Sequence, residues 1–263
     1  MAVGGPVDHP ELDGIIGNDP AYLLPALWIK PQDKTKAINF GFQVIELHDV
    51  LATHVTKVCS EHLDAIFNYD DVKLLNQRLA IHHPELAETL ANVITPSLQM
   101  QVIRQLLSQQ VPIINVRTIA NTIIESIETT KDPILLSSNI RVALKRTIVN
   151  LISPNSKSIN AFTLGNDVEN ELKSAITLAQ QTNPNTPLDS IPVEPVILQK
   201  FQNKMPTIVQ TMQVQNIAPV FIVPPTTRPM LAKLAKAFAK DLIVLSYNEI
   251  PNDYALNVLG QLD

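Results

Sequence analysis

The sequence has little glycine, a single cysteine and no long apolar run. Its 263 residues include 7 glycines against 20 prolines, which favours helices and short strands joined by stiff corners over flexible loops. Cys59 stands alone, so no internal disulfide can form. No window approaches the roughly 20 apolar residues of a membrane span, and the N-terminus lacks the basic flank and apolar core of a signal peptide. We therefore expect a soluble, cytoplasmic chain.

The sequence also lacks the motifs around which common catalytic sites are built. It contains no G-x-S-x-G elbow, no P-loop and no G-x-G-x-x-G. Asp70 and Asp71 are adjacent, so on a helix their carboxylates would not face each other. His54, Cys59 and His62 lie close in sequence, but their spacing matches no closed zinc pattern. We predict no catalytic residue, no metal and no cofactor, with a hydrolase as the third-ranked alternative.

The charge balance opposes binding to nucleic acid. The formal charge is −5, whereas such binding rests on dense neutralisation of phosphates by Lys and Arg. Apolar residues make up 45% of the chain, enough for one large domain or several small ones, each with its own core. We expect neither nucleic acid nor a small molecule as partner.

Residues 102–128 resemble two amphipathic helices hinged on a tight corner. Apolar residues recur at helical spacing on both sides of the corner, Pro112 breaks the first helix, and Asn115 suits the N-cap of the second. A DNA-reading helix-turn-helix shares this outline and is the alternative from another functional class. Arg117 is followed by Glu125 and Glu128, however, so the second helix carries no net positive charge. A packing motif is favoured.

Patterns along the chain predict a mixed fold. Residues 1–20 are rich in turn residues, 40–47 are typical of a strand, and 49–79 carry one broad apolar stripe with Asp49 as cap. Four helices are predicted at 84–94, 97–109, 116–126 and 133–152. After a polar linker at 153–158, strands are predicted at 159–164, 219–223, 242–246 and 254–259, with helices at 166–180, 193–214 and 228–240. The predicted fold class is α/β (α+β), with a small α/β unit, a central helical bundle and a C-terminal layered α/β domain.

These patterns divide the chain into three regions, 1–80, 81–153 and 159–263. Within the third region, Thr226-Thr227-Arg228-Pro229 opens a helix after a strand, where free amides could hold an anion. The glycines needed for close phosphate approach are absent, so an ordinary helix start is favoured.

Several segments resemble the FHIPEP family, the export-gate proteins of flagellar and injectisome type III secretion. Ser108–Ile119, SQQVPIINVRTI, is similar to the family's most recognisable cytosolic signature. Four further pieces follow the family's order and together cover about residues 17–260. They are D-P-A-Y at 19–22 with L-P-A-L-W-I at 24–29, A-T-H-V at 52–55, K-D-P at 131–133 with the helix through Arg141 and Arg146, and V-L-S-Y-N-E-I at 244–250.

The resemblance implies a non-enzymatic cytosolic docking platform. Family members carry a membrane-embedded N-terminal half, and their cytosolic parts form a ring of nine below the export channel, where chaperone–cargo complexes dock. Chaperones of flagellar members bind a dimple whose motif positions fall here on Asp19, Tyr22 and Thr53. The implied partners are chaperone–cargo complexes, further copies of the chain and other export-apparatus proteins. We also expect Arg141 and Arg146, on the helical region, to be ring contacts.

The sequence departs from the family pattern at several points. Tyr22 replaces the usual phenylalanine, and residues 66–72 lose a glycine and an arginine. The family's membrane half, and the opening of its first cytosolic subdomain, have no counterpart in this sequence, so we expect exposed apolar faces and self-association. The D-P-A-Y and A-T-H pieces favour a flagellar gate, with an injectisome gate as the alternative within the family.

Overall fold

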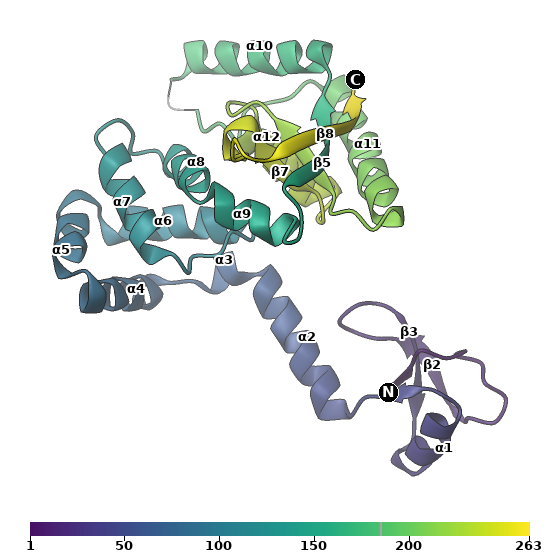
Figure 1. Ribbon diagram of the computed structural model, residues 1–263. Helices are drawn as coiled ribbons and strands as arrows, with labels where there is room; N and C mark the ends of the chain where they lie inside the picture. Colours follow the sequence, from purple (N-terminus) through teal and green to yellow (C-terminus); the bar gives the residue numbers. More distant parts are fainter. Residues whose placement is uncertain (185) are drawn as a thin grey trace. The chain divides into compact units, whose positions relative to one another are not determined.

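The computed structural model describes residues 1–184 and 186–263. It divides the chain into two compact units, Met1–Ile66 and Phe67–Asp263 (Figure 1). The first predicted boundary, at residue 80, falls inside helix α4 (Tyr69–His82). The division into the three regions 1–80, 81–153 and 159–263 stays a prediction.

The first unit is a small antiparallel sheet with three helices. The sheet has the order β2-β3-β1-β4. Its strands are β1 (Ala2–Val3), β2 (Gly14–Asn18), β3 (Pro25–Ile29) and β4 (Gln43–Val44). A short 3-10 turn η1 (Pro31–Asp33) precedes α1 (Lys34–Asn39), and α2 (Leu47–Glu61) and α3 (Leu63–Ile66) follow β4.

Several sequence predictions for this unit were wrong. The expected loop over residues 1–20 contains β1 and β2, because exposed Ile15 and Ile16 give no alternating pattern that would reveal a half-buried strand. The strand expected over 40–47 shrinks to two residues. The helix expected over 49–79 is three helices, and α2 begins at Leu47 without a side-chain cap from Asp49. Asn68 and Asp71 start α4 with a capping box, which explains the last break.

The second unit begins with a bundle of six helices. They are α4 (Tyr69–His82), α5 (Pro84–Val93), α6 (Pro96–Leu107), α7 (Val116–Ser126), α8 (Pro133–Ala143) and α9 (Lys145–Ile152). The predicted cap at Asn115 is confirmed, and Thr95 and Asp132 cap their helices in the same way, since each of the three accepts a hydrogen bond from a backbone amide of the following turn. The single helix predicted at 133–152 is interrupted at Leu144.

The corner between α6 and α7 packs as the sequence predicted. Val111 is buried, and its amide donates to the carbonyl of Leu106 at 3.0 Å after Gln110 adopts a left-handed φ of 55°. Both helices contribute to one apolar core, including Ile103 and Ile123. The pair therefore builds the bundle interior.

The rest of the second unit is a parallel sheet of order β7-β6-β5-β8 with helices. Its strands are β5 (Ser158–Leu164), β6 (Val220–Val223), β7 (Ile243–Ser246) and β8 (Ala255–Leu262). Its helices are α10 (Asn166–Thr182), α11 (Pro195–Val214) and α12 (Arg228–Phe238), with a 3-10 turn η2 (Tyr247–Glu249) after β7. The predicted strand–helix order is confirmed.

Alternation along the strands creates three layers. Ile159, Val220 and Leu245 pack into the core shared with the helical bundle. Their neighbours Phe221 and Val244 face the second core, built with α10, α11 and α12. Because side chains on a strand alternate between its faces, one sheet separates two helical layers. The bundle and the C-terminal α/β region thus share one core.

Candidate functional site

The segment Asp19–Leu24 between β2 and β3 is organised by the side chain of Asp19. Its carboxylate accepts hydrogen bonds from the amides of Ala21 (3.2 Å) and Tyr22 (3.1 Å), while its carbonyl accepts from Leu23 at 2.8 Å. Leu23 adopts a left-handed φ of 57°. The amide of Asp19 closes the loop by donating a hydrogen bond to the carbonyl of Leu24 at 2.8 Å. This buried carboxylate turns the chain so that the apolar side chains of the tip face solvent.

Tyr22 is held at the loop tip by a cation from α2. The Lys57 ammonium lies 5.0 Å from the centroid of the Tyr22 ring and donates a hydrogen bond to the carbonyl of Ala21. The Tyr22 side chain is still 60% exposed, and Leu23 and Leu24 beside it are exposed as well. The cation–π contact fixes the position of the aromatic ring without covering it. An ordered aromatic residue facing solvent is typical of an interaction site.

Thr53 lies on α2, one turn before Lys57. Residues four apart share a face of a helix, so the exposed hydroxyl of Thr53 is next to Lys57 along that face. The same edge of the helix carries Val50, which is buried against Ala26. One turn further along, Glu61 Oε1 lies 3.8 Å from the Lys57 ammonium. We call the group Tyr22, Leu23, Leu24, Thr53 and Lys57 the docking surface. All three residues predicted for chaperone docking belong to it or, in the case of Asp19, shape it.

A second feature of α2 is an apolar stripe that faces solvent. Its members recur at helical spacing and are all exposed: Leu47, Leu51, Val55 and Val58. The sequence predicted one broad apolar stripe over residues 49–79, which included Leu51, Val55 and Val58, and of the residues on α2 only Val50 is buried. We call these four residues the α2 stripe. Contiguous exposed apolar side chains of this kind mark an interaction surface.

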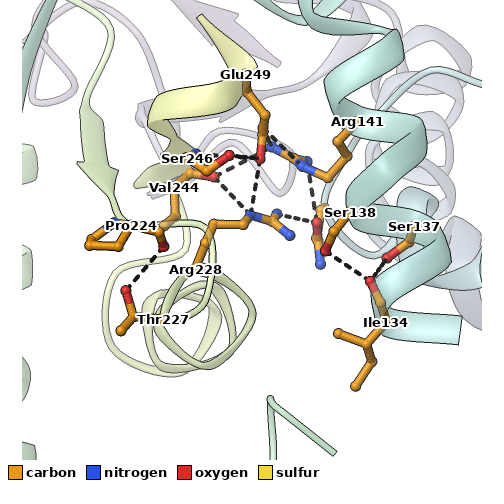
Figure 2. A network of polar contacts seen from close by, with 11 residues as sticks. Ile134, Ser137, Ser138, Arg141, Pro224, Thr227, Arg228, Val244, Ser246 and Glu249 are labelled. Carbon is orange, nitrogen blue, oxygen red and sulfur yellow. Dashed lines mark hydrogen bonds and ion pairs between the residues drawn. The ribbon is translucent and has the colours of Figure 1, made fainter. Parts of the chain in front are cut away.

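The structure places Arg141 in the interior, which corrects its prediction as a ring contact. Figure 2 shows its guanidinium reaching from α8 to Glu249, in the 3-10 turn η2 that follows β7. The distances from Arg141 to Glu249 Oε2 are 3.0 Å from Nε and 2.5 Å from Nη2, and the two side chains are 2% and 1% exposed. A side chain this deeply buried and paired cannot contact a second copy without unfolding its surroundings.

Arg228, at the start of α12, completes this buried cluster. Its Nε lies 3.6 Å from Glu249 Oε1, and its side chain is 2% exposed. The side-chain carbonyl of Gln109 accepts hydrogen bonds from both arginines, and the hydroxyl of Ser246 donates to Glu249 at 3.0 Å. The anion site considered for residues 226–229 therefore has its arginine engaged internally. The cluster joins the bundle to the C-terminal sheet.

The pKa values of the cluster follow from burial and pairing. Burial raises the pKa of Glu249, but Arg141 and Arg228 outweigh this effect and hold it below its ordinary value. Burial, with the neighbouring Arg141, lowers the pKa of Arg228 to about 9. Glu249 and Arg228 are therefore charged at neutral pH.

Arg146 remains exposed on α9. Its guanidinium contacts Asp253 at 3.0 Å, and Lys157 approaches the same carboxylate at 3.5 Å. The pairing with Arg146 is the chief cause that holds the pKa of Asp253 below its ordinary value. An intramolecular pair of this kind still leaves Arg146 accessible, so its role as a ring contact stays a prediction.

The candidate metal residues are not assembled into a site. In the described part of the chain, no group of three or more His, Cys, Asp or Glu side chains could hold a metal ion. Cys59 is exposed, and His54 Nδ1 is buried without a hydrogen-bond partner there. Separately, no helix among the described residues is long and apolar enough to cross a membrane.

Sequence reasoning missed Lys57, Arg228 and Glu249. Lys57 could have been found, because it lies four residues after Thr53 on a predicted helix. Glu249 and Arg228 gave no local signal, since their partner Arg141 is 108 residues from Glu249 in the chain. Charged residues are rarely buried, so composition alone gives no reason to place these two in the interior.

Comparisons with known proteins identify the family of this sequence. The profile of the FHIPEP family matches residues 1–255. The chain is 41% identical over its whole length to LfhA of Escherichia coli O44:H18, whose name describes a flagellar export/assembly protein. It spans 37% of the length of that relative.

Two solved structures share the fold. The chain superposes on the Chlamydia pneumoniae CdsV–CdsO complex with a TM-score of 0.76 at 19% identity, covering 100% of this chain and 74% of the other. It superposes on the nonameric EscV cytosolic domain from a type III secretion system with a TM-score of 0.73 at 18% identity, covering 100% of this chain and 76% of the other. At these identities the likeness concerns the fold.

Proposed function

The chain belongs to the FHIPEP family, and we propose that it is a non-enzymatic docking platform of a bacterial flagellar type III export gate. Its task is to bind chaperone–cargo complexes on the cytosolic side and to assemble with further copies into a ring. The observation that carries this proposal is the exposed Tyr22, fixed between the loop ordered by Asp19 and the Lys57 ammonium.

The docking surface has the chemistry that a protein partner requires. Tyr22, Leu23 and Leu24 offer exposed apolar area, which supplies affinity when a partner covers it. Lys57 and the hydroxyl of Thr53 offer polar groups that select the orientation of the partner. Asp19 contributes indirectly, because its hydrogen bonds to the loop amides hold the aromatic tip in place.

A flagellar system is preferred over an injectisome. The chain is 41% identical to a relative named for flagellar export and assembly, whereas the type III secretion structures share only its fold at 18–19% identity. An injectisome gate remains the second candidate, supported by those structures.

Self-association and contacts with other export proteins complete the proposal. The EscV cytosolic domain is nonameric, and CdsV is found in complex with CdsO. The exposed α2 stripe gives this chain apolar area for contact with further copies or with another export-apparatus protein. Arg146 stays a candidate contact because its guanidinium is accessible.

Calorimetric titration with a late flagellar export chaperone loaded with its cargo tests the docking claim. We expect micromolar binding by the unaltered chain. Tyr22→Ala should weaken it by roughly tenfold or more, since an ordered aromatic residue is a common hot spot. Thr53→Val should weaken it less, because it removes one hydroxyl and keeps the side-chain shape.

The matched control is Thr211→Val, an exposed threonine on α11 in the other unit. Circular dichroism on each variant checks that the fold is retained, as expected for side chains exposed to solvent. Binding unaffected by Tyr22→Ala and Thr53→Val, or absent in a folded unaltered chain, would remove the docking surface from the proposal.

A further inference from the structure

A groove lies on the C-terminal α/β region, far in sequence from the docking surface. It has a volume of about 840 Å³ and is formed between α10 and the segment that leads into α11. Its lining is mostly apolar and includes Ala175, Leu178 and Ala179 from α10, and Val193 and Ile197 from the opposite wall. This volume is within the range of ligand-binding clefts, roughly 300–1,000 Å³.

Both walls of the groove are held in place by contacts outside it. On one side, α10 is anchored by Val168, Leu172 and Ile176, which are buried in the core beneath it. On the other side, Leu188 and Ile191 are buried in that same core. Lys233 of α12 reinforces this second wall by approaching Asp189 at 3.9 Å and donating to Ser190 at 3.2 Å. The groove is thus formed before any partner arrives.

Between these two walls, the side chain of Leu178 is exposed to solvent. Its side chain is 66% exposed although it sits on the long amphipathic helix α10, whose other large apolar residues are buried. Val193 faces the groove from the opposite wall and is only half-buried. These side chains provide apolar area on both sides of an open channel, which suits a chain segment laid along it.

The charge of the groove is one-sided. Among the described residues of its lining, Glu171 on α10 and Glu194 before α11 are charged and none is a cation. The described residues offer neither carboxylate an ion-pair or hydrogen-bond partner, whereas the neighbouring Glu169 is paired with Lys173. Two unneutralised carboxylates on opposite walls favour a positively charged partner.

We propose that this groove is a second docking site, which takes a short basic amphipathic segment of a partner protein. The apolar side chains of that segment would pack between Leu178 and Val193, and its Lys or Arg residues would pair with Glu171 and Glu194. In this mode of recognition, an amphipathic helix lays its apolar face in an apolar groove that carries charges complementary to its own. The proposal does not depend on the docking surface of the first unit, because no residue is shared.

A designed peptide tests the proposal on the full chain. The probe is a fluorescein-labelled helix-forming peptide of roughly 12 residues, about three turns, with leucines on one face and lysines on the other. Its matched control carries glutamate in place of each lysine. Binding is followed by fluorescence anisotropy at about 0.15 M salt, where distant charges are screened.

We expect the basic peptide to bind and the acidic peptide to bind at least about tenfold more weakly. Leu178→Gln should weaken the basic peptide about tenfold, as expected for loss of an apolar anchor, and the double variant Glu171→Gln/Glu194→Gln several-fold. The controls Val214→Gln and Glu88→Gln change exposed residues outside the groove and should leave affinity unchanged.

Four outcomes would overturn the proposal. The first is no binding of the basic peptide, and the second is equal binding of the two peptides. The third is that Leu178→Gln affects affinity no more than Val214→Gln does. The fourth is that the neutral dye Nile red enters the groove and the peptide fails to displace it, which would indicate a small-molecule site.

Discussion

The two compact units of the chain differ in the size of their apolar cores and in how their buried charged side chains are paired. In Phe67–Asp263, Arg141 and Arg228 are buried and both pair with the buried Glu249, and two large apolar cores lie on either side of one sheet. In Met1–Ile66 the apolar clusters are small, and large apolar side chains such as Tyr22, Leu51 and Val55 face solvent.

This difference indicates a division of work between the units. A unit with a large shared core and a buried ion cluster has a fixed internal geometry, which suits a scaffold. A unit that leaves ordered apolar side chains exposed gains stability when a partner covers them, which suits docking. The predictions below test this division, beginning with the largest expected effect.

Removing Arg141 should damage the scaffold unit severely. Arg141→Ala leaves Glu249 buried with a lost partner, so we expect the free energy of unfolding to fall by about 3–5 kcal/mol. Urea denaturation followed by circular dichroism measures this loss. The control is Arg146→Ala, whose exposed pair with Asp253 is screened by solvent and should contribute little. Equal effects of the two substitutions would contradict the role assigned to the buried cluster.

Acid should weaken the scaffold unit through Glu249. Its folded-state pKa is below the ordinary value of 4.5, so the unfolded chain takes up a proton first as the pH falls. The stabilisation that ionised Glu249 gives to the folded state is therefore complete above about pH 4.5. It is lost as the pH falls through the lower folded-state pKa of Glu249. Denaturant titrations at several acidic pH values should show this decline, and Glu249→Gln should flatten it. An unchanged slope in that variant would remove Glu249 as its source.

In the docking unit, losing Lys57 should have a smaller effect on stability. Lys57→Met keeps the aliphatic stem but removes the cation beside Tyr22 and the hydrogen bond to Ala21, a loss of about 1 kcal/mol. We expect faster amide exchange in residues 19–24 with unchanged exchange in the helical bundle. The control is Lys73→Met on α4. Unaltered exchange in the loop would show that Lys57 does not order it.

The α2 stripe should affect association and leave stability nearly unchanged. Leu51→Ser/Val55→Ser removes exposed apolar area, so the free energy of unfolding should change by about 0.5 kcal/mol or less per site. Sedimentation velocity should show less self-association than for the unaltered chain. The paired control Leu178→Ser in the other unit should not reduce self-association. A double variant that associates as strongly as the unaltered chain would exclude the stripe as a contact between copies.

The same contrast explains what the sequence could predict. The bundle and the C-terminal α/β region were predicted well, because Asn115 and Asp132 mark helix starts and the strands are short apolar runs. The first unit was predicted poorly, since exposed Ile15 and Ile16 conceal β2 and the α2 stripe has the periodicity of a buried face. Periodicity reports which residues share a face of a helix and does not report what covers that face.

For the sites, local residues were predictable and distant pairings were not. Asp19, Tyr22 and Thr53 come from short motifs that resemble the family, and the structure brings them to one loop and the neighbouring face of α2. Arg141 was expected at the surface, because nothing near it in sequence reveals that Glu249 lies opposite. Only the fold places those two charges together.

Hydrogen–deuterium exchange of the full chain, with and without a late flagellar chaperone–cargo complex, tests the central division most directly. We predict that the complex slows exchange in residues 19–24 and along residues 50–61 of α2. Exchange in α6, α7 and α8 should stay unchanged. Protection confined to the scaffold unit, with residues 19–24 unaffected, would contradict the assignment of docking to the first unit.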